Sequence, residues 1–296
     1  MLSLNFFYLI YIIHQSGRLK ETAGVFMEQS REIIYIDSAK RFAGTETDFT
    51  YHVLPRSKEF DRVVLLSATI PKTFYLVDEH YRSFILEEDG KQATITLEAG
   101  DYDFYSFRVR LATLLNAGSP KGWTYTVEYP QSRSMASTGR YTYKVKNNGG
   151  LQPKFIISES LNRLMGFNQQ STYTFIDDQL ESANVINFQP ISTLFLSSDM
   201  VGGENKTDIL QEIFAAGVPF MANIVYECPD IEACSRKITD IRKDLFRFWV
   251  VDQSGRHIEM NGYSIVISLL LYNSKTYEGL PLTGQLIKSL EALVKK

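Results

Sequence analysis

The sequence is poor in cysteine, and this limits how the chain can hold itself together. Its 296 residues include two cysteines, Cys228 and Cys234. Two are too few for a disulfide scaffold, and they lack the closely spaced further ligands that a structural zinc site requires. We therefore expect two free, mostly buried thiols in a protein that matures in a reducing compartment. A chain of this length buries roughly three-quarters of its unfolded surface, which suffices for a core without such cross-links.

An excess of charge of either sign is also missing. The formal net charge is −3, and 22% of the residues are charged. Such a balance offers no basic field for a phosphate backbone, so we expect no specific nucleic-acid partner. The hydrophobic fraction of 44% is ordinary for a folded domain and argues against disorder.

The apolar stretch near the N terminus is too short to span a bilayer. Residues 4–13 (LNFFYLIYII) make up about ten residues, whereas a transmembrane helix needs about twenty. The stretch also lacks the basic start and the small-residue cleavage site of a signal peptide. Three interpretations stay open: Met27 is the true start, the stretch is a weak membrane anchor, or it is an ordinary buried segment. We assign residues 1–26 to an N-terminal extension outside the folded domain and expect no stable membrane span.

The sequence motifs of common enzymes are absent as well. There is no G-x-x-x-x-G-K-S/T, no G-x-G-x-x-G, no G-x-S-x-G and no H-E-x-x-H. Histidines are few, and none has a second histidine at helical or hairpin spacing; they are His14, His52, His80 and His257.

Acidic residues cluster at 87–89 (EED) and 177–178 (DD), each beside turn signals, where we expect solvated loop ends. Asp101 and Asp103 lack the further oxygen donors that a calcium site needs. We therefore assign no catalytic, cofactor-binding or metal-binding residues, expect no cofactor, and predict that the protein is not an enzyme.

Aromatic residues that favour strands are abundant, with seventeen Tyr and nineteen Phe against two Trp. Apolar and polar side chains alternate over residues 93–97, 123–129 and 140–145, which is typical of antiparallel strands with one solvated face. Other stretches are apolar on both faces, as central strands between packed layers are: residues 63–66, 155–157, 246–251 and 265–272. About twelve to fourteen such strands predict an all-β fold, a jelly-roll β-sandwich with additional strands.

A few short helices complete the predicted fold. Residues 100–116 carry apolar side chains at helical spacing, with Asp101 positioned to cap the helix. Residues 161–167 predict a short turn that ends at Gly166, and residues 209–214 predict another. Residues 282–294 predict an amphipathic helix in a C-terminal tail, residues 274–296. That helix docks on its own domain, docks on a neighbouring subunit, or stays mobile.

The order of several short segments carries information beyond composition. The first three are residues 36–41 (IDSAKR), Gly44-Thr45 and residues 47–50 (TDFT). The later segments are FDRVVLL at 60–66, GDY at 100–102, LMGF at 164–167, NVINF at 184–188, SSDM at 197–200, VVD at 250–252 and EMNG at 259–262. In this succession the chain resembles the penton, or minor capsid, proteins of virophages and Polinton-type DNA viruses, among them the mavirus-like ones. The resemblance covers residues 33–272.

The resemblance implies a jelly-roll capsid domain with insertions over residues 27–273. Members of that family form homopentamers at the fivefold vertices of an icosahedral capsid, beside a double-jelly-roll major capsid protein. For this chain it implies a structural protein of the virion, assembled inside the host cell, with a host receptor as a further partner.

Two other classes of function stay open. One is a β-sandwich module that binds a glycan or a receptor, for which the polar loop at residues 131–139 is the candidate tip. The other is a hydrolase on a β scaffold, which would need two opposed carboxylates in one cleft.

Removal of residues 1–26 is expected to leave folding intact, because this segment matches no strand of the predicted domain. The test compares the thermal unfolding of the full chain with that of a chain starting at Met27. Loss of soluble, cooperatively unfolding protein on truncation would show that the segment belongs to the domain.

Overall fold

The computed structural model describes residues 31–275, except for 58, 81, 130–136, 148, 158–160, 170, 190, 203–207 and 241. The chain divides into two compact units. Unit 1 is formed by the described residues of Met1–Lys72 and Thr193–Lys296, and unit 2 by those of Thr73–Ser192. Strands dominate both units, which confirms the predicted all-β class.

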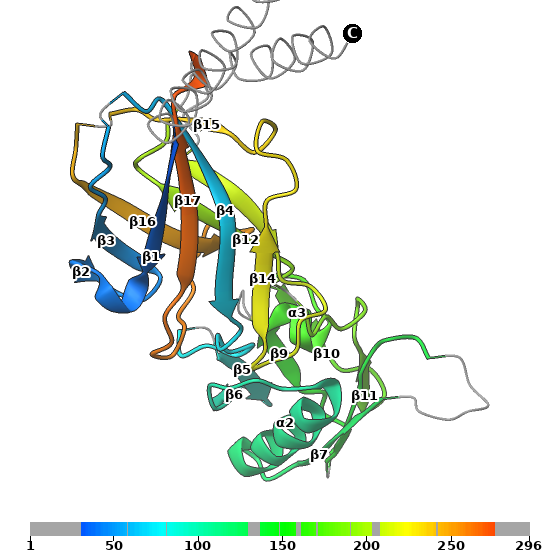
Figure 1. Cartoon of the computed structure of the whole chain (residues 1–296). Coiled ribbons are helices and arrows are strands. Elements are labelled where there is room, and N and C mark those ends of the chain that lie inside the picture. Colours follow the sequence, from blue (N-terminus) through cyan, green and yellow to red (C-terminus); the bar gives the residue numbers. More distant parts are fainter. Residues whose placement is uncertain are drawn as a thin grey trace, which may run out of the picture. The chain divides into compact units, whose positions relative to one another are not determined.

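Unit 1 is a sandwich of two antiparallel sheets (Figure 1). The first sheet has the order β1 (Arg31–Asp37), β17 (Val266–Tyr272), β4 (Arg62–Pro71) and β14 (Asn223–Glu227), and β15 (Arg236–Lys237) also pairs with β4. The second has the order β13 (Ile209–Phe214), β12 (Thr193–Ser198), β16 (Leu245–Asp252), β3 (Asp48–His52) and β2 (Ala43–Gly44).

The strand order of unit 1 is that of a jelly roll. The eight longer strands, counted along the chain, are β1, β3, β4, β12, β13, β14, β16 and β17, so the two sheets read 1-8-3-6 and 5-4-7-2. Each sheet thus alternates strands from the first and the second half of the unit, which is the double Greek-key arrangement of the eight-stranded jelly roll. The predicted jelly-roll β-sandwich is confirmed.

The core of unit 1 lies between its two sheets. Along β4, β16 and β17 the inward side chains are fully buried, and each except the small Ala68 contributes about 1.5–3 kcal/mol of burial free energy. They are Val63, Leu65, Ala68 and Ile70 on β4, Phe246, Phe248 and Val250 on β16, and Ile267, Leu269 and Leu271 on β17.

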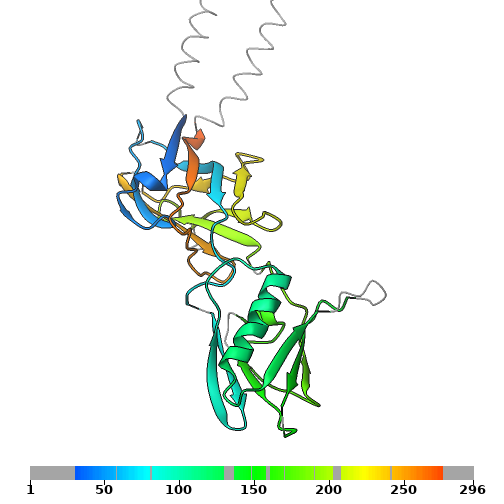
Figure 2. The same ribbon diagram turned by 90° about the horizontal axis from the view of Figure 1, so that it is seen from below.

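Unit 2 is built from two smaller antiparallel sheets, one long helix and one short helix. One sheet has the order β10 (Ser171–Thr174), β9 (Lys154–Ile157), β5 (Ser83–Glu88) and β6 (Lys91–Thr96). The other has the order β11 (Gln179–Glu181), β8 (Thr142–Lys146) and β7 (Thr124–Glu128). Helix α2 (Phe104–Gly118) lies along these strands in Figure 2 and buries Phe107, Leu111 and Leu115 in their shared core.

Two helical predictions agree with the structure, one of them with a different cap. The 100–116 helix forms as α2, but it begins at Phe104, and Asp103 rather than Asp101 is its N-cap. The Asp103 Oδ1 atom accepts hydrogen bonds from the backbone N–H groups of Tyr105, at 2.9 Å, and Ser106, at 2.6 Å. The turn that ends at Gly166 forms as α3 (Asn162–Met165), and Gly166 has a left-handed φ of 77°.

The prediction of a helical turn at residues 209–214 is wrong, because this segment is strand β13. The pairing of β13 with β12 shifts register between Leu196 and Ser197, so that Leu210 is an extra residue. Leu210 and Ile213 are both buried across this β-bulge. The bulge converts the two-residue period of a strand into the three-residue spacing that resembles a helix.

Three predicted features lie outside the described residues. They are the N-terminal extension, the C-terminal amphipathic helix and most of the loop at 131–139. Within the described part of the chain, no helix has the length and apolar character that a membrane crossing requires.

Substitution Asp103→Ala is expected to lower the free energy of unfolding by about 1 kcal/mol, because two backbone N–H groups of α2 lose their acceptor. Asp103→Asn is the matched control and should be nearly neutral, since asparagine caps as well as aspartate. Urea denaturation followed by circular dichroism measures both. Equal stability of the alanine variant and the parent would contradict the cap assignment.

Candidate functional site

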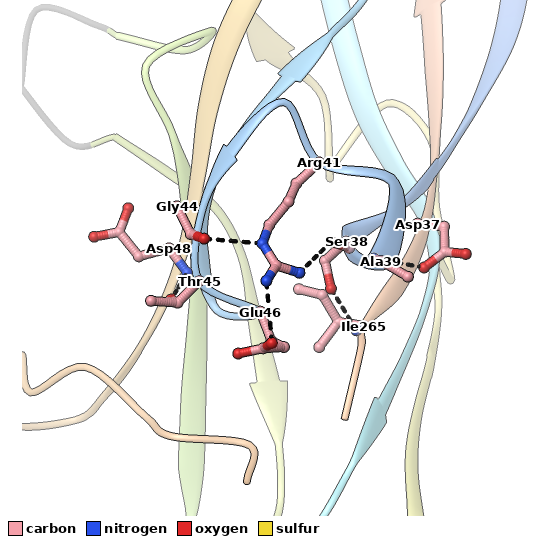
Figure 3. A network of polar contacts seen from close by, with 9 residues as sticks. All are labelled: Asp37, Ser38, Ala39, Arg41, Gly44, Thr45, Glu46, Asp48 and Ile265. Carbon is pink, nitrogen blue, oxygen red and sulfur yellow. Dashed lines mark hydrogen bonds and ion pairs between the residues drawn. The ribbon is translucent and has the colours of Figure 1, made fainter. Parts of the chain in front are cut away.

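The first sequence motif builds a corner of the jelly roll. The guanidinium of Arg41 donates hydrogen bonds to the carbonyl oxygens of Gly44, at 2.9 Å, and Ser38, at 3.0 Å (Figure 3). The Nη2 group of the same guanidinium donates to Glu46 Oε1 at 3.2 Å. Because all three partners belong to the connection from β1 to β3, one side chain fixes the path of that connection.

The same corner is tied to the start of the last strand. Ser38 is fully buried, and its backbone N–H donates to the carbonyl oxygen of Ile265 at 2.9 Å. The backbone N–H of Ile265 donates in return to Ser38 Oγ, also at 2.9 Å. Asp37 accepts from the backbone N–H of Ala39 at 2.9 Å. Residues 37–46 therefore fasten the connection after β1 to the start of β17, so this motif has a structural role. The sequence showed the motif but did not reveal that role.

The acidic cluster at 87–89 contains a buried carboxylate. Glu88 is fully buried, so the expected solvated loop end is wrong for this residue. Its oxygens accept from Ser119 Oγ at 2.8 Å, from the backbone N–H of Lys121 at 2.7 Å and from the Tyr125 hydroxyl at 2.7 Å. Burial, and then the bond to Glu88, raise the pKa of Tyr125 well above its usual range. With its hydrogen-bonding capacity used inside the fold, Glu88 joins β5 to the end of α2.

The second acidic cluster lies beside a surface hollow in unit 2. Asp177 and Asp178 form a turn with positive φ values of 49° and 62°. The hollow, of about 410 Å³, is lined by carboxylates, hydroxyls, an amide and two aliphatic side chains: Thr142, Thr174, Ile176, Asp177, Gln179, Leu180 and Glu181.

The described histidines and the two cysteines lie apart from these acids. His80 is exposed, His52 packs edge-on against Phe42 at 4.9 Å between ring centres, and His257 Nδ1 lies 3.8 Å from Asp48. Cys228 and Cys234 are free and half-buried. Within the described ranges, no three or more His, Cys, Asp or Glu residues group as a metal site would need.

Three tyrosines of unit 2 lie in its core and do not form an exposed aromatic surface. Tyr125, Tyr141 and Tyr143 are almost fully buried in unit 2. The Tyr143 hydroxyl donates to the carbonyl oxygen of Met165 at 2.9 Å, so its polar end is satisfied within the core. Most exposed large apolar side chains of unit 1 occur instead at the lateral edges of its sandwich, whereas Tyr263 and Val266 lie before and at the start of the interior strand β17.

We define the β1–β2 flank as the side of unit 1 formed by β1, the 3-10 turn η1 (Ser38–Lys40) and β2, together with residues 54–56. Here β1 and β2 are edge strands of the first and second sheets (Figure 1). Tyr35 is 71% exposed, and Ile33, Phe42 and Leu54 are exposed as well. The ion pair between Arg56 and Glu32 places residues 54–56 beside the start of β1.

We define the β13–β14 flank as the opposite side of unit 1, formed by β13, β14 and the connection between them. These two strands are the other edges of the second and first sheets. Phe214 at the end of β13, Met221 in the connection and Val225 on β14 are all exposed, Met221 by 74%. Met221 also has a positive φ of 64°, which is uncommon for a residue other than glycine.

The two flanks are surfaces suited to bind protein. Edge strands present backbone N–H and C=O groups that can pair with another chain, and proteins usually protect them with charge or short length. Apolar side chains gathered beside such edges favour burial in an interface. The candidate functional site is therefore a pair of opposite surfaces on one sandwich, which no single sequence motif marks.

No family model matches the chain, and no curated protein matches it. Among solved structures, the crystal structure of the selenomethionine-labelled mavirus penton protein is similar, at 10% sequence identity and a TM-score of 0.43. The match covers 81% of this chain and 99% of that chain. Mavirus-like penton proteins are also the proteins that the order of the sequence motifs resembles.

Substitution Arg41→Ala is expected to lower the free energy of unfolding by about 1–3 kcal/mol, because the carbonyls of Ser38 and Gly44 and the Glu46 carboxylate lose a charged hydrogen-bond donor. Arg41→Lys should recover only part of this, since an ammonium cannot reproduce the planar fork. The exposed neighbour Lys40→Ala is the control and should change little. Unfolding of the three variants in urea measures the effect; equal losses at positions 40 and 41 would contradict the role of Arg41.

Proposed function

We propose that this protein is a structural subunit of a viral capsid that forms homopentamers at the fivefold vertices of an icosahedral shell. The observation that supports this most is a jelly roll with exposed apolar side chains on both lateral flanks. Jelly rolls form capsid domains, lectins and cupins, so the fold alone does not select among them. The two opposite flanks favour a building block, because a closed ring needs two different surfaces on each copy.

The ring argument follows from symmetry. In a cyclic assembly with more than two copies, one surface of each subunit meets a different surface of the next. A binding module for a small ligand needs one concave site and gains nothing from two apolar edges. The described surface of unit 1 has two different apolar flanks, as a subunit of a ring requires.

The proposal includes partners and location. As a vertex subunit the protein would contact a double-jelly-roll major capsid protein, would reside in the virion after assembly inside the host cell, and would offer a surface to a host receptor. The order of the sequence motifs supports this placement. The proposed role is structural and needs no catalytic residue.

A second candidate function is supported by the hollow in unit 2. Its lining combines carboxylates, hydroxyls and an amide with the exposed Ile176, and such a mixture suits a polyhydroxylated ligand. A glycan-binding module is therefore the alternative, and it is compatible with a capsid protein that attaches to a host surface.

The test of the proposed function is the solution mass of the full chain, measured by light scattering coupled to size exclusion over a range of concentrations. We expect a species of five times the chain mass of 33.9 kDa, seen as rings by negative-stain microscopy.

A chain that stays monomeric at every concentration and binds an immobilised glycan would support the alternative. In that outcome, Asp177→Asn and Gln179→Ala should weaken glycan binding, whereas Lys146→Ala, elsewhere on unit 2, should not.

A further inference from the structure

We propose that the β1–β2 flank of one copy docks on the β13–β14 flank of a second copy, with basic residues of the first flank facing acidic residues of the second. This inference rests on the proposed self-assembly and names the two surfaces that carry it.

The β1–β2 flank presents exposed positive charge. Arg31 on β1, Lys40 in η1 and Arg56 beside β1 are all exposed, and the Arg56 side chain is 87% exposed. The acidic groups of this flank already have partners. Glu32 accepts from the backbone N–H of Arg56 at 2.7 Å, and Glu46 pairs with Arg41.

The third acid of the β1–β2 flank is Asp37, which is also engaged, since it accepts from the backbone N–H of Ala39. With Arg41 and Arg56 paired to Glu46 and Glu32, the four cations of this flank exceed its three acids by one positive charge, and Arg31 and Lys40 are its exposed cations outside those two ion pairs. A surface of this kind attracts acidic partners over about one Debye length, or about 8 Å at physiological salt.

The β13–β14 flank presents the opposite charge. Asp208 just before β13, Glu212 on β13 and Glu227 on β14 are exposed, and none of the three forms an ion pair with another described residue. Neither β13 (ILQEIF) nor β14 (NIVYE) contains a lysine or an arginine. The cation on this flank is Lys72, whose ammonium donates to the carbonyl oxygens of Ala215 and Val218 in the connection, so three exposed acids stand against one cation.

The apolar groups of the two flanks match in the same two-layer arrangement. At the edge of the first sheet, Ile33 and Tyr35 on β1 correspond to Val225 on β14. At the edge of the second sheet, Phe42 beside β2 corresponds to Phe214 on β13. Each flank therefore offers an apolar centre on both layers with charge beside it, which is the anatomy of a specific protein interface.

A second copy of this chain is the occupant that these observations favour. The complement of each flank, in charge and in apolar content, is the other flank of the same sandwich. Complementary charge of this kind speeds encounter and fixes register, while like charges placed together weaken association strongly. Because the two surfaces differ, the contact is heterologous and repeats from copy to copy.

The experiment reverses the charge of one flank, then of the other, and then of both. The first variant is Arg31→Glu with Lys40→Glu, the second is Glu212→Lys with Glu227→Lys, and the third combines all four changes. Each single-flank variant is expected to assemble about tenfold less well or worse, and the combined variant to recover assembly because opposite charges again face each other. Lys146→Glu, an exposed change in unit 2, is the matched control and should assemble like the parent.

Mass measurement by light scattering reports assembly, and circular dichroism with thermal unfolding shows that each variant is folded. Raised salt should weaken the parent assembly and lessen the difference between variants. Undiminished assembly of both single-flank variants, or failure of the combined variant to recover, would overturn the pairing of flanks while leaving the capsid proposal in place. A parent chain that never assembles would contradict the proposed function itself.

Discussion

Every open β-sheet ends in strands whose outer backbone groups lack a partner, and this constraint governs unit 1. Within the described residues, β1 and β14 end one sheet, and β2 and β13 end the other. The chain keeps β2 to two residues, which is a usual way to protect an edge, but β1 and β13 run for seven and six. Long edges that also expose Tyr35 and Phe214 are a liability for a protein that must stay alone. They are an advantage for one that must join its neighbours.

The position of the insertion follows from the same constraint. Unit 2 is inserted after β4 and before β12, and both of these are interior strands of their sheets. The chain leaves and re-enters the jelly roll without interrupting an edge strand, so both flanks keep their backbone and side-chain surfaces. Unit 2 has its own core around Phe107, Tyr143 and Phe155, and an insertion with its own core can vary in its surface loops without disturbing the sandwich.

The sequence predicts the parts of this fold that local chemistry decides. Alternation over residues 123–129 marks β7, and Gly166 ends α3 because only a left-handed residue closes that turn easily. The predictions are wrong where a contact with a residue far away in the sequence determines the local structure or the burial of a side chain. The sequence of strand β13 resembles a helical turn, because its β-bulge changes the spacing of the buried side chains and forms only in the pairing with β12. Glu88 reads as a solvated acid because its partners Ser119 and Tyr125 are more than thirty residues away in sequence.

The candidate site is the part that the sequence could not locate, and the aromatic residues show why. Tyr141 and Phe42 belong to the same compositional excess, yet Tyr141 is buried with its hydroxyl donating to the Phe104 carbonyl at 2.5 Å, while Phe42 is exposed. What separates them is the packing around each: Tyr141 lies against Phe107 of α2, while Phe42 lies beside an edge strand. Such packing is set by the order of strands rather than by any one strand. Strand order in a jelly roll joins segments from the two ends of the chain, as β1 pairs with β17. Exposed apolar flanks of this kind therefore emerge only once the topology is known, whereas a catalytic motif can often be recognised in the sequence itself.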